Sequence, residues 1–86
     1  MSWFIYIIQS KIDGDYYKGI SENVVKRLSE HNSGLSQFTS SKIPWKLVYF
    51  SAIKTKREAI IEEKRIKRLN RLSLEKLIHF TQNLVQ

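Results

Sequence analysis

The sequence contains no cysteine, one proline and three glycines among its 86 residues. Without cysteine the chain forms neither a disulfide nor a thiolate zinc site, as we expect for a cytoplasmic protein. No apolar run approaches the roughly 20 residues of a membrane-spanning helix. The first apolar run ends at Gln9 and has no basic leader, so we expect no signal peptide.

Acidic residues are also scarce in this chain. Fifteen Lys and Arg against eight Asp and Glu give a net charge of +7. In a small domain such an excess favours a polyanionic partner, most often nucleic acid. Basic side chains also serve solubility alone, so charge by itself does not choose between the two interpretations.

Two stretches rich in aromatic and aliphatic residues predict a β-hairpin. Residues 3–8 are apolar at both odd and even positions, which indicates a central strand covered on both faces. Residues 15–20 follow Asp13-Gly14, the signal of a two-residue hairpin loop. We therefore expect two adjacent antiparallel strands.

A two-residue loop predicts how these strands pair. It sets Ser10 opposite Tyr17 and Ile8 opposite Gly19. Facing residues share a face of the sheet and faces alternate along a strand, so Tyr6 is predicted on the same side as Tyr17.

Capping signals predict three helices. Ser21 starts the first and Gly34 ends it, Thr55 opens a capping box for the second, and Ser73 caps the third after a break at 70–72. The apolar residues expected to face the core are Val24, Val25 and Leu28, then Ala59, Ile60, Ile61, Ile66 and Leu69, and finally Leu74, Leu77 and Ile78.

A third strand is predicted over 45–53, after a loop at 33–44 that contains one short helical turn. Together these elements predict an α+β fold with a small three-stranded antiparallel sheet flanked by helices, in the order ββα-β-αα. We expect one domain over residues 1–86, with fraying from Thr81.

Several polar residues are candidates for chemistry. Two tyrosines on one sheet face are usually packing residues. Arg27 and His31 share a helix face, although each alone is typical of a solvated or packing residue. Both Glu62 and Glu63 are predicted beside the apolar stripe of the second helix, where a carboxylate needs a partner or a metal, and helix geometry does not choose between them. The simpler interpretation is that both pair with basic residues along the helix.

A basic run follows on the same helix. Such a run is by default a solvated helix face. Its sign and density, together with the net charge, favour contact with phosphates through Lys64, Lys67 and Arg68.

Six short segments, taken in order, form a known pattern: Phe4-Ile5-Tyr6, Tyr17-Lys18-Gly19, Val25-Lys26-Arg27-Leu28, His31-Asn32-Ser33-Gly34, Pro44-Trp45-Lys46-Leu47-Val48-Tyr49 and Ala59-Ile60-Ile61-Glu62-Glu63-Lys64. In these segments the chain resembles the GIY-YIG endonuclease superfamily. The resemblance is to its small single-domain, UPF0213-like branch, which is similar to the amino-terminal nuclease domain of a bacterial excinuclease. Phe4 replaces a glycine of the first motif, Lys18 an apolar residue of the second, and Leu69 a frequent tryptophan.

The resemblance implies an endonuclease that hydrolyses phosphodiester bonds in nucleic acid, DNA more than RNA, in repair or recombination. It implies one divalent metal, Mg²⁺ or Mn²⁺, held by Glu63, and an Arg27 that binds the scissile phosphate. Tyr17 is the better candidate for the base and Tyr6 for its hydrogen-bonded partner, with the reverse order open. His31 would assist the base or contact phosphate, and the nucleic-acid backbone would be followed by Lys64, Lys67 and Arg68.

Two other functions fit the same residues. A nucleic-acid-binding module of this fold with weak or no catalysis would show a salt-dependent, metal-independent affinity. An adaptor whose basic helix contacts an acidic protein would not respond to nucleic acid.

Overall fold

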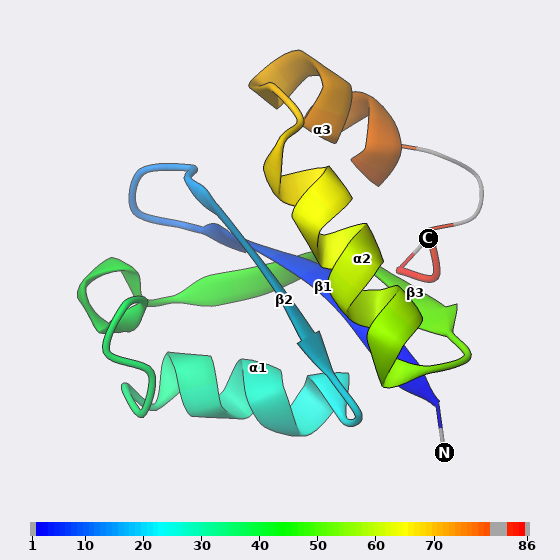
Figure 1. Cartoon of the computed structure of the whole chain (residues 1–86). Helices are drawn as coiled ribbons and strands as arrows, with labels where there is room; N and C mark the ends of the chain where they lie inside the picture. Colours follow the sequence, from blue (N-terminus) through cyan, green and yellow to red (C-terminus); the bar gives the residue numbers. More distant parts are fainter. Residues whose placement is uncertain (1, 80–82, 86) are drawn as a thin grey trace.

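The structure is a computed structural model that describes residues 2–79 and 83–85 (Figure 1). Residues 81 and 82, at the start of the tail expected to fray, lie outside the described part. The elements are β1 (Trp3–Ser10), β2 (Tyr16–Ser21), α1 (Val24–Asn32), a 3₁₀ turn (Ser40–Lys42), β3 (Trp45–Ile53), α2 (Lys56–Lys67) and α3 (Arg71–Ile78).

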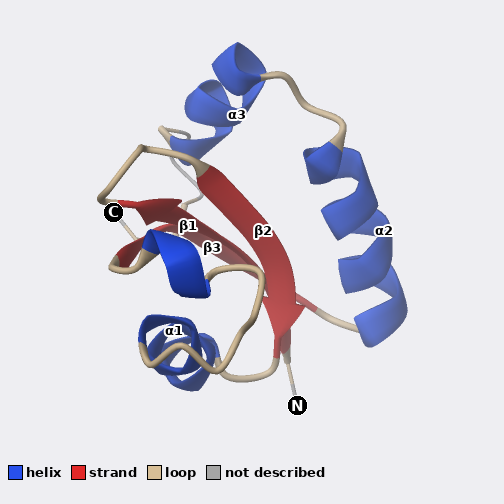
Figure 2. Ribbon diagram, turned by 90° about the vertical axis from the view of Figure 1, so that its left-hand side faces the viewer, coloured by secondary structure: helices blue, strands red, loops and turns tan. Residues whose placement is uncertain are grey.

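The three strands form one antiparallel sheet in the order β2-β1-β3, so the first strand is central, as predicted. Helix α1 covers one face of the sheet, and α2 with α3 lies on the other (Figures 1 and 2). The predicted α+β fold is confirmed. No helix within residues 2–79 and 83–85 is both long and apolar enough to cross a membrane.

Alternation along β1 divides the core into two clusters. On the α1 face the buried residues are Tyr6, Ile8, Val24 and Trp45. On the α2 and α3 face they are Ile5, Ile7, Tyr49, Ile66 and Leu74. The central strand is covered on both sides for this reason, which explains its lack of polar alternation.

The predicted pairing of the hairpin is wrong by two residues. Tyr6 lies opposite Gly19, and Ile8 lies opposite Tyr17. The loop therefore comprises residues 11–14. A shift of two positions keeps every side chain on its predicted face, so the shared face of the two tyrosines is confirmed.

Side chains in the loop explain its extra length. The Ser10 hydroxyl accepts a hydrogen bond from the backbone N–H of Ile12 at 3.1 Å, and the Asp13 carboxylate accepts one from Asp15 at 3.0 Å. Gly14 adopts a φ of 78°, which glycine tolerates without strain. These local bonds satisfy the turn backbone and stabilise a wider loop than the two-residue signal predicts.

The start of α1 also differs from its prediction. Asn23, rather than Ser21, is the N-cap, and its side chain accepts from the N–H of Lys26 at 3.0 Å. Ser21 still belongs to β2, so it cannot begin the helix. The predicted stop at Gly34 holds: this residue has a φ of 85° and follows the Ser33 C-cap.

The cap of α3 is Asn70 and not Ser73. The Asn70 side chain accepts from the Ser73 N–H at 2.8 Å, which places the predicted cap inside the helix. The Thr55 cap of α2 is confirmed by the bond from the Glu58 N–H to its hydroxyl at 3.1 Å. The break between α2 and α3 thus falls at 68–70, slightly earlier than predicted.

Three residues predicted to face the core are exposed: Val25 (79%), Ile60 (36%) and Ile61 (59%). Each helix meets the sheet along a narrow stripe, occupied in α2 by Ala59 and Ile66. Residues one or two positions away point about 100–200° around the helix, so they leave that stripe.

Gly19 leaves space for the side chain of Tyr6. A Cβ atom at this position would lie 2.6 Å from the hydroxyl oxygen and 2.7 Å from the Cζ atom of Tyr6. The Tyr6 phenol therefore lies directly over the glycine, where other residues carry a side chain. Only glycine permits this close approach across the strand pair.

We predict that Gly19→Ala lowers the free energy of unfolding by about 1–3 kcal/mol, because the added methyl group displaces a buried phenol. Urea denaturation measures this loss. In a Tyr6→Leu background the cost of Gly19→Ala should shrink. The control is Gly34→Ala, whose cost comes from its φ of 85° and should be equal in both backgrounds. An undiminished cost of Gly19→Ala would contradict the contact.

Candidate catalytic site

A hydrogen bond between Tyr6 and His31 lies at the centre of the site. His31 lies on the face of α1 that packs on the sheet, and the His31 side chain is fully buried. Its Nε2 atom is 2.9 Å from the Tyr6 hydroxyl oxygen, and its Nδ1 atom is 2.8 Å from the hydroxyl of Thr39. The hydrogen-bond partner of Tyr6 is thus His31, whereas the sequence suggested Tyr17.

Tyr17 belongs to the same cluster through its ring. Its centroid lies 5.0 Å from that of His31 in an edge-to-face arrangement, and 6.4 Å from that of Trp45. Tyr17 is half-buried whereas Tyr6 is 2% exposed. Of the two phenols, Tyr17 is therefore the more accessible to solvent.

Arg27 supplies a cation next to this cluster. It lies one turn before His31 on α1, with its side chain 34% exposed and its Nη1 atom 3.0 Å from a Glu30 carboxylate oxygen. That carboxylate raises the pKa of Arg27 further above its usual range. A shallow hollow of about 340 Å³ opens beside it, lined by Ser21, Asn23, Lys26 and Glu30 among others.

Glu63 approaches from the other side of the sheet. It belongs to α2, its side chain is 20% exposed, and its carboxylate lies 3.5 Å from the Lys67 ammonium. Glu62 is more exposed, at 32%, and forms a bidentate pair with Arg65. Both carboxylates thus pair along the helix, as in the simpler interpretation, and Glu63 is the more buried of the two.

The pKa of Tyr6 reflects both its burial and the charged groups near it. Burial raises it from 10.0 to about 12, the nearby Arg27 guanidinium opposes this rise, and the charges of Tyr17 and Glu63 add to it. Burial, helped by the charge of Arg27, lowers the pKa of His31, while Glu30 opposes that change. At neutral pH both members of the central pair are therefore uncharged.

The structure thus brings Tyr6, Tyr17, Arg27 and His31 together between α1 and the sheet. Glu63 comes from α2 on the opposite face of the sheet, and β2, an edge strand, lies between α1 and α2 in the view of Figure 2. The roles predicted for these residues stay predictions. Lys64 and Lys67 on α2 and Arg68 at its C-cap, the residues expected to follow nucleic acid, are all exposed.

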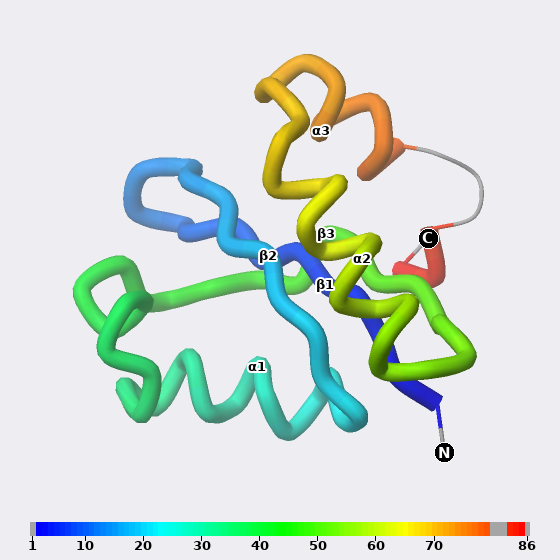
Figure 3. The backbone as a smooth tube through the Cα atoms, viewed as in Figure 1, coloured from blue at the N-terminus to red at the C-terminus, as the bar shows by residue number. Residues whose placement is uncertain are grey.

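Thr39 is a site residue that sequence reasoning missed. It lies in the connection at 33–44, which folds back along the end of α1 before β3 begins (Figure 3). The Trp45 indole N–H donates to the Thr39 carbonyl at 2.9 Å, and the Asn32 amide exchanges two hydrogen bonds with the Trp45 backbone. The available signal was His31 itself, because a buried imidazole needs two polar partners.

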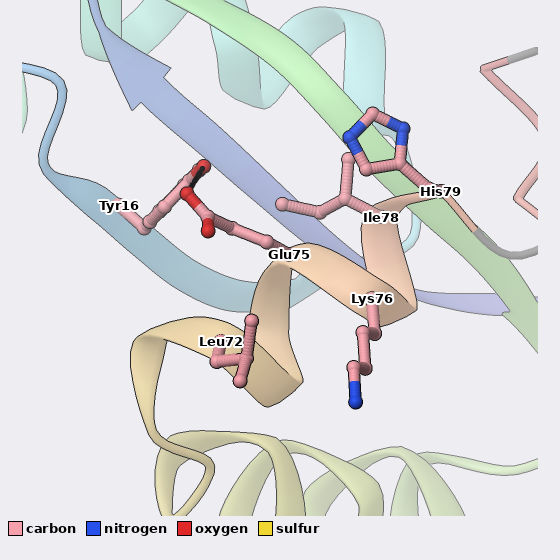
Figure 4. Close-up of a pocket in the computed structure, with 6 residues that line it drawn as sticks. All are labelled: Tyr16, Leu72, Glu75, Lys76, Ile78 and His79. Atoms are coloured by element: carbon pink, nitrogen blue, oxygen red, sulfur yellow. Dashed lines mark hydrogen bonds between the residues drawn. The ribbon is translucent and has the colours of Figure 1, made fainter.

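A second hollow lies away from this cluster. A cavity of about 540 Å³ lies between β2 and α3, and its lining includes Tyr16 and Glu75, whose side chains lie next to each other in Figure 4, with the Tyr16 hydroxyl donating to the Glu75 carboxylate at 3.5 Å. Arg71 stacks over the Tyr16 ring at 5.0 Å and pairs with Glu75 at 3.3 Å. These contacts attach α3 to the hairpin on the face opposite to that of Tyr17.

The fold is that of a catalytic domain of a nuclease family. The family model of the GIY-YIG catalytic domain matches residues 2–77. The chain therefore belongs to the GIY-YIG family, and the resemblance stated from the sequence motifs is confirmed.

Individual relatives belong to the UPF0213 group. The chain is 39% identical over 71 residues to a UPF0213 protein of Desulfotalea psychrophila, covering 80% of this chain and 64% of that protein. It is 37% identical over 78 residues to one of Bacillus licheniformis, covering 90% and 79%. The solution NMR structure of a UPF0213 protein of Bacillus halodurans matches with a TM-score of 0.62 and 31% identity, covering 99% of this chain and 90% of that one.

We predict that Tyr6 ionises near pH 12 in a spectrophotometric titration compared with that of Tyr6→Phe. Its folded pKa exceeds the unfolded value of 10.0, so its contribution to stability is complete below about pH 10 and is lost as the pH rises towards 12. The wild type should lose roughly 2–3 kcal/mol more than Tyr6→Phe over this range in urea denaturation. A midpoint near pH 10 for Tyr6 would contradict its burial.

Proposed function

We propose that this chain is a metal-dependent endonuclease that hydrolyses phosphodiester bonds in nucleic acid, DNA more than RNA, within the cytoplasm and in repair or recombination. The whole of residues 1–86 would act as one catalytic domain. The observation that carries the proposal is the hydrogen bond between Tyr6 and His31, with Arg27 beside it and Glu63 in electrostatic range. Family membership supports nuclease chemistry at this cluster.

In the proposed reaction Tyr6 takes the proton of the attacking water while its own proton passes to Nε2 of His31. A tyrosine alone is a poor base, because its ordinary pKa is near 10 and burial raises it here to about 12. A neutral imidazole in hydrogen-bond contact would accept the phenol proton as the water proton arrives, so the phenol need not ionise first. Tyr17, the more accessible phenol, would orient the water. This assignment, with Tyr6 as the base, is the reverse order that the sequence left open.

Arg27 would hold the scissile phosphate. Its guanidinium presents donors in a planar fork that suits phosphate oxygens, and it is the cation next to the phenol. Substrate phosphate would compete with Glu30, whose carboxylate pairs with it in the free protein. The same cation would stabilise the charge that develops on the phosphoryl oxygens.

Glu63 would hold the metal, Mg²⁺ or Mn²⁺. The described residues contain no group of three or more His, Cys, Asp or Glu that could enclose an ion. One partly buried carboxylate still fits Mg²⁺, which keeps several waters and binds substrate oxygens in addition to one or two carboxylates. When bound, the ion would act as a Lewis acid on the phosphate.

We predict that Glu63→Gln lowers the cleavage rate at least 100-fold, because neutralising the carboxylate removes the metal ligand. The assay uses labelled branched, flapped and single-stranded DNA and RNA, with Mg²⁺ or with EDTA. Glu62→Gln is the matched control: it lies next to Glu63 on α2 and pairs with Arg65, so its rate should stay near that of the wild type.

Three results would change the assignment. Full cleavage by Glu63→Gln or by Arg27→Ala would exclude the proposed site. Binding without cleavage on every substrate would favour the nucleic-acid-binding module, and no response to any nucleic acid would favour the protein adaptor.

Lys64, Lys67 and Arg68 would follow the phosphate backbone from the exposed side of α2. We predict that each single change to Gln weakens DNA binding at all sequences and reduces the slope of log K against log salt by about 1. Lys76→Gln on α3, beside the second hollow of Figure 4, is the control and should leave the slope unchanged. Unchanged slopes in all three variants would mean that the nucleic acid binds elsewhere.

A further inference from the structure

A continuous chain of buried polar groups leads away from Tyr6. After the bond to Nε2 of His31, the Nδ1 atom lies 2.8 Å from the Thr39 hydroxyl, which in turn lies 3.3 Å from the carbonyl oxygen of Ser36. Thr39 is 1% exposed and Ser36 is 9% exposed. Because these groups are shielded from water, each must find its hydrogen-bond partner within the series.

The groups at the two ends of this hydrogen-bonded series determine which atom donates in each bond. At one end the Ser36 carbonyl can only accept, and the Thr39 hydroxyl donates to it at 3.3 Å. At the other end the Arg27 guanidinium acts on the Tyr6 oxygen as a donor only, so Nε2 is the acceptor available to the phenol proton. Thr39 can then only accept from Nδ1, which places the one proton of a neutral imidazole on that atom.

The position of Thr39 is itself determined by the fold. Its carbonyl accepts from the Trp45 indole at 2.9 Å and from the N–H of Lys42 at 3.2 Å. Its own N–H donates to the Ser36 carbonyl at 3.2 Å. Lys42 forms ion pairs with Asp13 and with Asp15 on the hairpin loop, which joins the two loops at the surface. The hydroxyl of Thr39 is therefore held towards the imidazole.

We propose that Thr39 is a positioning residue, which holds the proton of His31 on Nδ1 and so leaves Nε2 free to accept the proton of Tyr6. This inference rests on the proposed nuclease function and deepens it. In the reaction an O–H bond of the attacking water breaks as its oxygen bonds to phosphorus. The released proton joins the Tyr6 oxygen, and the Tyr6 proton joins Nε2. The leaving oxygen departs with its bonding electrons and takes a proton from solvent.

The test begins with the ring nitrogens of the wild-type protein. In ¹⁵N NMR spectra at neutral pH, His31 should show a protonated Nδ1 and an unprotonated Nε2. His79, the other histidine of the chain, is exposed and serves as the internal reference. A wild-type His31 protonated on Nε2 overturns the proposal, whether or not any variant folds and whether or not the protein cleaves.

Two variants then separate positioning from packing. Thr39→Val keeps the shape but loses the hydroxyl, so His31 should shift towards the Nε2-protonated form and cleavage should fall about 10- to 100-fold, with little change in substrate affinity. Thr39→Ser keeps the hydroxyl and should restore the wild-type tautomer, rate and pH profile. Equal rates in Thr39→Val and the wild type would overturn the proposal.

The proposed function can fail separately. A wild-type protein that has the expected tautomer but cleaves no substrate would overturn both the nuclease function and the proton transfer. Failure of the tautomer in an active nuclease would overturn the role of Thr39 and the transfer of the Tyr6 proton to Nε2, but not the nuclease function.

Discussion

Burial of one imidazole imposes the main constraint on this structure. The two ring nitrogens of His31 need hydrogen-bond partners once α1 covers the sheet. These partners are Tyr6 on β1 and Thr39 in the loop after α1. The helix, the central strand and the loop are therefore held in one relative position by hydrogen bonds as well as by apolar contacts. An unpaired nitrogen here would cost about 1–3 kcal/mol, which is a large part of the stability of a small domain. Burial keeps both groups uncharged and the pairing orients them, which is the state that the proposed proton transfer needs.

The edge position of β2 gives the site its second property. This strand has a neighbour on one side only, and the charges of Arg27 on α1 and Glu63 on α2 both act on the Tyr6 phenol. Gly19 on this strand leaves the space that the phenol occupies. A cation from α1 and a carboxylate from α2 can thus influence one oxygen without being buried together, so the chain avoids the desolvation cost of a fully buried ion pair.

Much of the fold follows from local patterns. The strand over 45–53, the central first strand, the Thr55 cap and the stop at Gly34 all agree with the structure. The errors are local as well: Asn23 and Asn70 replaced the expected serine caps, and the hairpin loop is two residues longer. In each case a nearby Asn, Asp or Ser side chain offered the backbone a competing hydrogen bond. The face of each tyrosine was nevertheless predictable, because a shift of two residues preserves the alternation of a strand.

The sequence by itself determined the order of the elements, the family motifs, the excess positive charge and the shared face of Tyr6 and Tyr17, since these depend on spacing along the chain. Only the tertiary structure decided that Tyr6 pairs with His31, that Glu63 is less exposed than Glu62, and that Thr39 reaches the imidazole. These facts depend on distances between segments that are remote in sequence. A loop of serines and threonines carries no local mark of which hydroxyl a buried histidine will need, because that need arises only when the helix closes over the sheet.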